Sequence, residues 1–396
     1  MATNKTDKVL NVPTLRFPGC TDEWEILTLG KICDTFEYGM NVPAKEYDGE
    51  NRYIRITDID DCSHLYSLLN EVSPDGNLED KYLVKEGDIL FARTGASVGK
   101  SYIYRSSDGK LYFAGFLIRA HVRCEYNPFF VFYQTLTSKY SKWVNIMSAR
   151  SGQPGINSQE YASYQLSVPP MNEQKKLADF LSLIDERIAL QSKLIEDLKI
   201  LKSAIVERLY GQYSSRIRIG TIIKPVSIRN RDGRELEVMS VSNKYGFIAQ
   251  LEQFEERLVA SEDTSNYKVI TPGIFAYNPA RINVGSIAQY KGDRPCIVSP
   301  MYICFECGEQ VIGGYLEHFF STKYFHKEME KRLEGSVRLC LSFEALCNIP
   351  ISLPTIEQQQ KYAHVVGIIS EQISTETGIL QAYQKQKLYL LSAMFI

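Results

Sequence analysis

Several features that would announce a membrane or secreted protein are missing from this sequence. The 396-residue chain has no apolar run of the ~18–20 residues that a membrane-spanning helix needs. Its first residues are polar and lack the apolar core of a signal peptide. The formal net charge is −2, so the chain also lacks the strongly basic balance typical of many nucleic-acid-binding domains. We therefore expect a cytoplasmic protein with no membrane contact.

The cysteines do not form a recognisable framework. The nine of them are scattered along the chain, which is typical of reduced thiols in a reducing compartment. Cys304 and Cys307 are the only close pair. A zinc site would need a second pair or two suitably spaced histidines. We therefore interpret these cysteines as small buried side chains and predict no metal site.

Catalytic motifs are also missing. The segment Gly95–Ser101 has three residues between its glycines, whereas a phosphate-binding P-loop needs four. Tyr277–Ala280 lacks the second proline and the final aromatic residue of the Asn-Pro-Pro-aromatic motif found in amino-group methyltransferases. Clustered aspartates can hold Mg²⁺, but an acidic turn is the favoured interpretation of Asp58, Asp60 and Asp61. No catalytic residue is predicted.

What the sequence does contain is an internal repeat. Segment 85–99 is similar to segment 271–285, and three residues of each coincide at a constant offset of 186. Further on, Pro170–Gln174 recurs as Pro354–Gln358 at an offset of 184. Each Glu-Gln pair opens a helical pattern. Two copies of a globular unit plus a long helix predict a molecule with approximate internal two-fold symmetry.

Both long helices carry a heptad pattern of apolar residues, which is typical of a coiled coil. Two polar residues interrupt each pattern at matching positions, Gln191 with Glu376 and Lys202 with Lys387. If the helices run antiparallel, Lys202 could approach Glu376 or the opposite end of the partner helix. The alternative is an ordinary amphipathic pair inside one domain. The residues predicted to pack the two helices together are Leu181, Ile184, Ile188, Ile195, Leu198, Val366, Ile369, Ile373, Leu380 and Tyr383.

The rest of the chain has short β patterns separated by turn residues. Arg52–Ile59 alternates in the manner of a half-buried strand, and Leu236–Ser242 is its counterpart. Helices are expected near Pro128–Leu136 and Gly314–Phe320. The predicted class is α+β, with two mixed α/β units related by a pseudo-two-fold and joined by two long antiparallel helices. The predicted parts are residues 1–171, 172–212, 213–354 and 355–396.

Loops rich in Arg, Asn, Gln and Gly are the remaining candidates for function. Arg can contact guanine with two hydrogen bonds, and Asn or Gln can do the same with adenine. Backbone N–H groups beside glycine can hold phosphates. The same residues are common in plain surface loops, so the loops alone do not decide between DNA contact and a structural role.

Taken in order, the motifs of the whole chain resemble the specificity (S) subunit of type I restriction-modification enzymes. No single motif is specific, but together they cover nearly the whole chain. They are Leu15–Gly19 with Trp24, Gly87–Arg93 with Val98 and Gly99, Gly152–Asn157, Pro169–Lys176, Phe275–Gly285, Gly335–Arg338, Leu353–Gln358 and Leu390–Phe395.

The resemblance implies a non-catalytic DNA-binding subunit. Residues 1–171 and 213–354 would be target-recognition domains that each read half of a bipartite target in double-stranded DNA. The helices in 172–212 and 355–396 would set the spacing. Two methyltransferase (M) subunits would hold S-adenosylmethionine, and restriction/translocase (R) subunits would use ATP and Mg²⁺, so this chain needs no cofactor of its own. The candidate DNA-contact residues are Arg93, Thr94, Lys100, Arg150, Gln153, Asn157, Asn278, Arg281, Asn283 and Arg338.

Two departures from the family pattern keep alternatives open. Residues 20–171 hold 15 Lys and Arg against 20 Asp and Glu, so any DNA face on the first unit must be local. The second long helix has Ser370 where the first has Asp185. The alternatives are a two-headed adaptor that binds no DNA, and a stand-alone DNA methyltransferase or nuclease.

Overall fold

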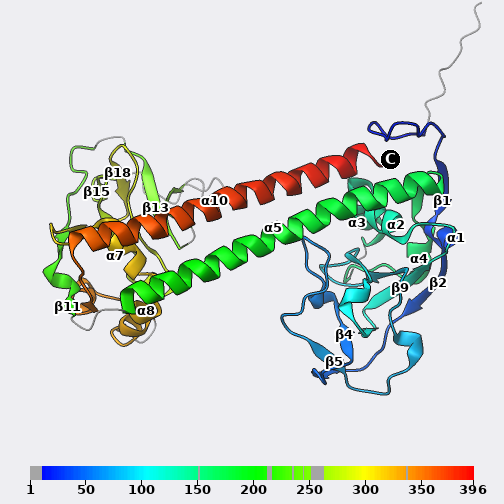
Figure 1. The fold of residues 1–396 in the computed structure, drawn as a ribbon, viewed down its shortest axis with the longest axis horizontal. Helices are drawn as coiled ribbons and strands as arrows, with labels where there is room; N and C mark the ends of the chain where they lie inside the picture. Colours follow the sequence, from blue (N-terminus) through cyan, green and yellow to red (C-terminus); the bar gives the residue numbers. More distant parts are fainter. Residues whose placement is uncertain are drawn as a thin grey trace, which may run out of the picture. The chain divides into compact units, whose positions relative to one another are not determined.

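The computed structural model describes residues 11–149, 152–211, 216–233, 236–243, 245–250, 263–335 and 338–396. The chain divides into two compact units. The first unit combines Met1–Ser192 with Gly378–Ile396, and the second is Lys193–Thr377. Helix α5 (Met171–Gly211) therefore begins in the first unit and ends in the second, while α10 (Ile356–Ala393) does the reverse (Figure 1). Among the described residues, no helix has the length and apolar character needed to cross a bilayer.

The first unit is built around a four-stranded antiparallel sheet in the order β2-β9-β6-β7. Its central strand β6 (Asp88–Ala92) is buried at every position. Ile89 and Phe91 join the core that contains α5, whereas Leu90 and Ala92 join a second core on the opposite face. The alternation follows from the two-residue period of a strand. The other strands are β2 (Cys33–Tyr38), β9 (Leu117–Val122) and β7 (Ser101–Ile103).

Shorter strand pairs and helices complete this unit. Strands β4 and β8 pair in parallel, while β1 with β10 and β3 with β5 pair antiparallel. The elements are β1 (Glu25–Thr28), α1 (Leu29–Ile32), β3 (Ala44–Glu46), β4 (Arg52–Ile54), β5 (Val72–Pro74), β8 (Leu111–Phe113), α2 (Pro128–Gln134), α3 (Ser138–Met147), α4 (Ser158–Ser163) and β10 (Gln165–Val168).

The second unit repeats this plan. Its antiparallel sheet has the order β12-β19-β16-β17, and β13 pairs in parallel with β18 as β4 does with β8. The elements are β11 (Ile217–Arg218), β12 (Ile223–Val226), β13 (Val238–Ser242), β14 (Gly246–Ala249), β15 (Lys268–Ile270), β16 (Phe275–Tyr277), β17 (Ile287–Gln289), β18 (Cys296–Val298), β19 (Ile303–Cys307), α7 (Gly313–Phe319), α8 (Lys323–Glu330), α9 (Phe343–Cys347) and β20 (Pro350–Ile351). The predicted α+β class is confirmed, and both units share one strand order.

A buried glutamine marks the start of each long helix. Gln174 Nε2 donates to Pro169 O at 2.8 Å, and its Oε1 accepts from Asn127 N at 3.0 Å. In the second unit Gln359 Nε2 donates to Pro354 O at 3.0 Å, and its Oε1 accepts from Ile312 N at 2.9 Å. The repeat here therefore has an offset of 185, and the counterpart of Gln174 is Gln359. The matching of Gln174 with the exposed Gln358 was wrong by one residue.

The helices run antiparallel within the first unit. Lys387 Nζ lies 2.6 Å from Asp185 Oδ1, and Arg187 Nε donates to Tyr383 Oη at 3.0 Å. The residue that lies further along α5 therefore contacts the residue that comes earlier in α10, as expected for antiparallel helices. The ten predicted packing positions are all buried or half-buried. The first core combines α5, α10 and α2 through Leu177, Leu181, Phe130, Leu390 and Met394.

Lys202 does not lie where the heptad pattern suggested. The charges that act on it belong to Glu317 on α7 and to Lys291, not to Glu376, and burial lowers the pKa of Lys202. The oxygen Oε1 of Glu376 accepts instead from Gln372 of its own helix. The expected approach of Lys202 to Glu376 is therefore wrong, because α7 packs beside this turn of α5.

The N-terminal segment closes the first unit. Leu15 N donates to Ala393 O at 2.9 Å, and Thr14 Oγ1 donates to the same carbonyl at 3.0 Å. Arg16 makes two 2.7 Å hydrogen bonds to the carboxylate of Glu173 in the first turn of α5. Bidentate Arg–carboxylate pairs have a fixed geometry. The segment therefore ties the end of α10 to the start of α5.

Candidate nucleic-acid interface

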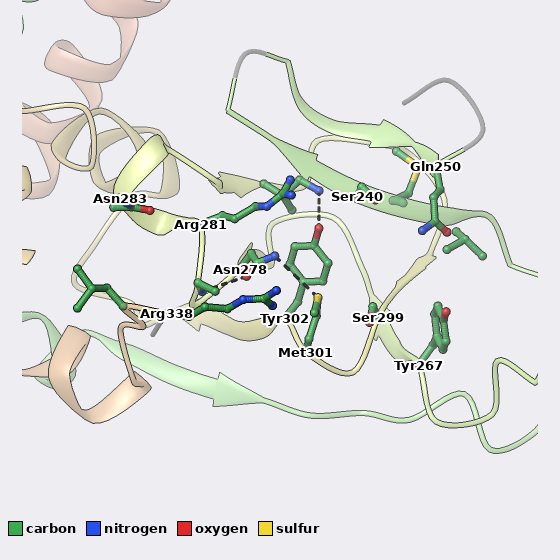
Figure 2. Close-up of a pocket in the computed structure, with 15 residues that line it drawn as sticks. Ser240, Gln250, Tyr267, Asn278, Arg281, Asn283, Ser299, Met301, Tyr302 and Arg338 are labelled. Atoms are coloured by element: carbon green, nitrogen blue, oxygen red, sulfur yellow. Dashed lines mark hydrogen bonds between the residues drawn. The ribbon is translucent and has the colours of Figure 1, made fainter. Parts of the chain in front are cut away.

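A groove of about 760 Å³ opens on the second unit. It lies between β13, the turn that precedes β19 and the loop that follows β16 (Figure 2). Asn278, Arg281, Asn283 and Arg338 all line it. The structure thus brings together the four candidate DNA-contact residues of this half. The other lining residues are Val238, Met239, Ser240, Val241, Gln250, Tyr267, Ala280, Ser299, Met301, Tyr302 and Leu339.

A tight turn after β16 positions Arg281. Asn278 Oδ1 accepts from Ala280 N at 3.0 Å, and Asn278 O accepts from Arg281 N at 3.0 Å. This is the self-capping geometry that favours asparagine in turns. A short 3₁₀ helix (Ile282–Val284) follows and ends at Gly285, whose φ of 89° favours glycine. The two glycine-containing repeat motifs therefore owe part of their pattern to turn geometry.

Arg338 reaches the same groove from a distant part of the sequence. Leu341 N donates to Pro279 O at 3.1 Å, which fastens the Arg338 loop beside the Asn278 turn. Figure 2 shows the Asn278, Arg281 and Arg338 side chains directed towards Tyr302 and Met301. Both arginines are exposed. Neither forms an ion pair within the described part of the chain, and none of the described lining residues is acidic. The groove therefore carries uncompensated positive charge.

Sequence reasoning missed several groove residues. Met301 Sδ lies 3.8 Å from Asn278 Nδ2, and Tyr302 Oη accepts from Val241 N at 3.3 Å. Gln250 has a buried side-chain oxygen without a hydrogen-bond partner among the described residues. These residues come from separate strands and turns, and no local motif marked them. The pairings of β13 with β18 and of β16 with β19 bring their segments together.

In the first unit, the loop at 152–157 lies along the segment that follows β6. Thr94 bridges to Gly155, Arg93 O accepts from Ile156 N at 2.9 Å, and Gly95 N donates to Pro154 O at 3.0 Å. The candidates Arg93, Thr94 and Gln153 are therefore brought together, and Gln153 is exposed. Arg150 lies outside the described residues.

Tyr38 is an unpredicted neighbour of this cluster. The Arg93 guanidinium lies 4.9 Å from the centre of the Tyr38 ring, a cation–π geometry. Tyr38 Oη donates to Ser158 Oγ at 3.3 Å and accepts from Ser158 N at 3.2 Å. Hydrogen bonding to Ser158, with the nearby charge of Arg93, lowers the pKa of Tyr38. Arg93 Nε is buried without a hydrogen-bond partner among the described residues.

Two of the candidate DNA-contact residues already bind other groups of the protein. Asn157 Oδ1 accepts from Glu160 N at 2.9 Å, and Glu160 Oε2 accepts from Asn157 N at 2.7 Å, which forms the capping box of α4. Lys100 is largely buried, donates to Ile59 O at 3.0 Å and pairs with Asp61. Both side chains therefore have structural roles that the sequence did not reveal.

The close cysteine pair lies on β19. Burial raises the pKa of both Cys304 and Cys307 to about 11, so these thiols stay protonated at neutral pH. Metal ligation requires the thiolate. In the described ranges, no group of three or more His, Cys, Asp or Glu side chains is arranged to hold a metal ion.

Comparisons with known proteins connect this chain to one family. Residues 21–199 match the type I restriction modification DNA specificity domain family. The MjaVIII type I restriction enzyme specificity subunit of Methanocaldococcus jannaschii is 22% identical over 426 residues, which cover 96% of this chain and 93% of that protein. Along nearly its whole length, the chain is thus similar to type I restriction-modification specificity subunits.

Solved structures show the same specificity-subunit fold. The type I restriction-modification S subunit from M. genitalium has a TM-score of 0.63 at 15% identity, covering 97% of this chain and 99% of that one. A chain solved for complex assembly and conformational transition of the type I R-M system has a TM-score of 0.53 at 15% identity, with coverage of 96% and 97%. At this identity the likeness concerns the fold, and it extends over both units.

Proposed function

We propose that this specificity subunit reads a bipartite target in double-stranded DNA, with one half-site contacted by each unit. The observation that carries the proposal is the convergence of Asn278, Arg281, Asn283 and Arg338 on one groove of the second unit. Two guanidinium groups without acidic neighbours suit a polyanion, and carboxamides suit base edges. An adaptor that binds no DNA would not need this combination.

Arg281 and Arg338 would each contribute to specificity or to affinity, according to the DNA group that each contacts. An arginine that reads guanine makes two hydrogen bonds to O6 and N7, and loss of such a pair costs ~1–3 kcal/mol. An arginine that contacts phosphate contributes salt-dependent affinity for any sequence. Asn278 holds the turn through its Oδ1, so its Nδ2 group is the part that faces the groove.

On the first unit, the corresponding site is the cluster of Arg93, Thr94 and Gln153 beside Tyr38. The ring of Tyr38 restrains the Arg93 guanidinium, which reduces the entropy lost when arginine contacts a base. Gln153 is exposed and can adapt to the base beside it. This cluster would give the first unit a local cationic site, although the unit as a whole is net acidic.

The long helices would seat the partner subunits. Outside their packed face, α5 and α10 expose large apolar side chains, and unpartnered apolar surface of this kind favours protein contact. These include Leu183, Leu190, Ile200, Ile368, Leu388 and Tyr389. We propose that two M subunits bind there and supply S-adenosylmethionine and methylation, and that R subunits supply ATP-driven restriction. This chain would itself be non-catalytic, without a cofactor, and would act in the cytoplasm.

The test is DNA binding by the subunit assembled with its methyltransferase partners, on duplexes whose half-sites come from methylation sequencing. Arg281→Ala and Arg338→Ala should each weaken binding by ~1–3 kcal/mol, with reduced discrimination at one half-site only or a smaller salt slope. Arg294→Ala is the matched control, because Arg294 is exposed on the same unit but does not line the groove. Equal affinity for all four proteins, or equal losses for Arg294→Ala and Arg281→Ala, would refute the proposal.

A further inference from the structure

One exposed apolar side chain occupies the same structural position in both units. In the first unit Phe91 pairs with Ile118, and in the second Tyr277 pairs with Ile303. These pairs align β9 with β19 at an offset of 185. Phe116 lies two residues before Ile118, and Met301 lies two residues before Ile303. Phe116 and Met301 are therefore equivalent positions of the two units. Both side chains are 60% exposed.

The turns that carry these residues agree with this alignment. Leu117 N donates to Ala114 O at 2.9 Å, and Tyr302 N donates to Ser299 O at 3.1 Å. Phe116 and Met301 are each the third residue of a four-residue turn. Both turns follow a strand, β8 or β18, that pairs in parallel with its neighbour. The match therefore rests on the turn and on two sets of strand pairs.

The sequence around this position has diverged, but its apolar character has not. The first turn reads Ala-Gly-Phe-Leu, and the second reads Ser-Pro-Met-Tyr. A single exposed apolar side chain needs no explanation. Two of them at one position of a diverged repeat indicate a shared use.

Both residues lie beside candidate DNA-contact residues. Arg93 N donates to Phe116 O at 3.1 Å, so Phe116 stands next to the Arg93–Tyr38 pair. Met301 lines the groove with Arg281 and Arg338, and its sulfur contacts Asn278. In each unit an apolar group is thus placed where arginines would hold a phosphate or a base edge. Charge complementarity makes duplex DNA the occupant that fits both places.

We propose that Phe116 and Met301 are paired apolar contact residues, each touching the apolar surface of a base in the half-site that its unit reads. This inference rests on the proposed DNA-binding function and adds two specificity-determining residues to it. The apolar surface is either the 5-methyl group of thymine in the major groove or the face of a base at an opened step. Both uses require an exposed side chain on a rigid turn close to cationic groups.

The inference is tested by measuring how tightly the subunit, assembled with its methyltransferase partners, binds a duplex that carries the target identified by methylation sequencing. Phe116→Ser and Met301→Ser should each weaken binding about tenfold, and the loss should depend on the sequence of one half-site, a different one for each variant. Ile146→Ser and Ile228→Ser are matched controls, because both side chains are exposed apolar groups outside the groove and the Arg93–Tyr38 pair. The controls should bind as the unsubstituted protein does.

Two modified duplexes distinguish the kinds of base contact. If Phe116 touches a thymine methyl group, replacing that thymine by deoxyuridine should weaken binding by the unsubstituted protein. The same replacement should not weaken binding by the Phe116→Ser variant any further. If it touches a base face, 2-aminopurine at the step becomes brighter with the unsubstituted protein and stays quenched with the variant. Unchanged affinity for both Ser variants, while Arg281→Ala still weakens binding, would overturn this inference alone. Absence of specific DNA binding by the unsubstituted assembly would overturn the proposed function.

Discussion

Asp185 on α5 forms an ion pair with Lys387 on α10, and the residues at the equivalent positions of the second unit cannot form one. The Tyr133 hydroxyl donates to Asp185 Oδ2 at 2.9 Å, which completes a polar cluster in the first unit. At an offset of 185 the corresponding residues are Ser370, Lys202 and His318. Lys202 thus has a serine, not a carboxylate, at the position of α10 that is equivalent to Asp185. Glu317, which acts on it, already pairs with Lys291 at 2.6 Å.

Removing the two lysines should therefore have different consequences. Lys387→Met leaves the Asp185 carboxylate partly buried without its cation, and we expect a loss of about 2 kcal/mol in the stability of the first unit. Lys202→Met removes a half-buried cation that has no such partner, so the second unit should lose no stability or gain up to about 1 kcal/mol.

Two measurements separate the units in the full chain. Both tryptophans, Trp24 and Trp143, belong to the first unit, so urea unfolding followed by tryptophan fluorescence reports that unit. Hydrogen exchange of peptides from β16 reports the second. Ser370→Asp should add stability to the second unit only when Lys202 is present. Equal destabilisation by both Met variants would contradict the assignment.

His318 predicts an acid-sensitive second unit. Burial lowers the pKa of His318 to about 4, whereas an unfolded histidine titrates near ~6.5. Between these values the unfolded state binds the extra proton, so stability present above pH ~6.5 is lost as the pH falls towards 4, by about 1–3 kcal/mol. His318→Tyr, which copies Tyr133, should remove this part of the pH dependence. His364→Gln, at an exposed position of α10, should keep it.

Asn157 and Gln153 should separate folding from DNA contact. Asn157 caps α4, so Asn157→Ala should lower the stability of the first unit by about 1 kcal/mol. Its DNA affinity should be unchanged well below the unfolding midpoint. Gln153→Ala should leave stability unchanged and weaken binding at one half-site. Tryptophan fluorescence and DNA titration on the same samples check both; the reverse pattern would show that Asn157 leaves its cap to contact DNA.

Neighbouring glutamines at the start of α10 should differ sharply. Gln359 is fully buried and connects Pro354, Gln310 and Ile312. Gln359→Leu strands these backbone groups and should cost the second unit about 2–3 kcal/mol. Gln358→Leu removes only an exposed capping hydrogen bond from Thr355 N to Gln358 Oε1 and should cost less than about 1 kcal/mol. The hydrogen-exchange measurement on β16 tests the difference, and similar losses would place the repeat at an offset of 184 after all.

The sequence was a good guide wherever the deciding pattern is local. A heptad repeat depends only on spacing along one helix, and the ten positions chosen from it on α5 and α10 are all buried or half-buried. Turn glycines marked the starts of β6 and β16, but two-residue alternation over Arg52–Ile59 was misleading, because only Arg52–Ile54 forms a strand and Ile56–Asp58 forms a 3₁₀ helix. The equivalence of Gln174 and Gln359 was misread because Glu-Gln is followed by two further glutamines, and only the hydrogen bonds show which of them is buried.

The candidate sites depend on contacts that no local pattern records. Arg338 meets the Asn278 turn because Leu341 pairs with Pro279, more than sixty residues away in the sequence. Lys100 has the composition of a phosphate contact, yet Asp61 from another loop neutralises it. Tyr38 escaped notice because β2 and Arg93 are far apart in sequence, whereas in the sheet only β9 separates β2 from β6, the strand that precedes Arg93.

The sharing of helices between the units has a consequence for synthesis on the ribosome. Leu390, Leu391, Met394 and Phe395 are buried in the core of the first unit, and residues 378–396 belong to that unit. Domains ordinarily fold in the order in which they emerge during translation. Here the domain that emerges first cannot finish its core until residues 378–396 have been translated. A premature stop before these residues would therefore damage the domain that is encoded first.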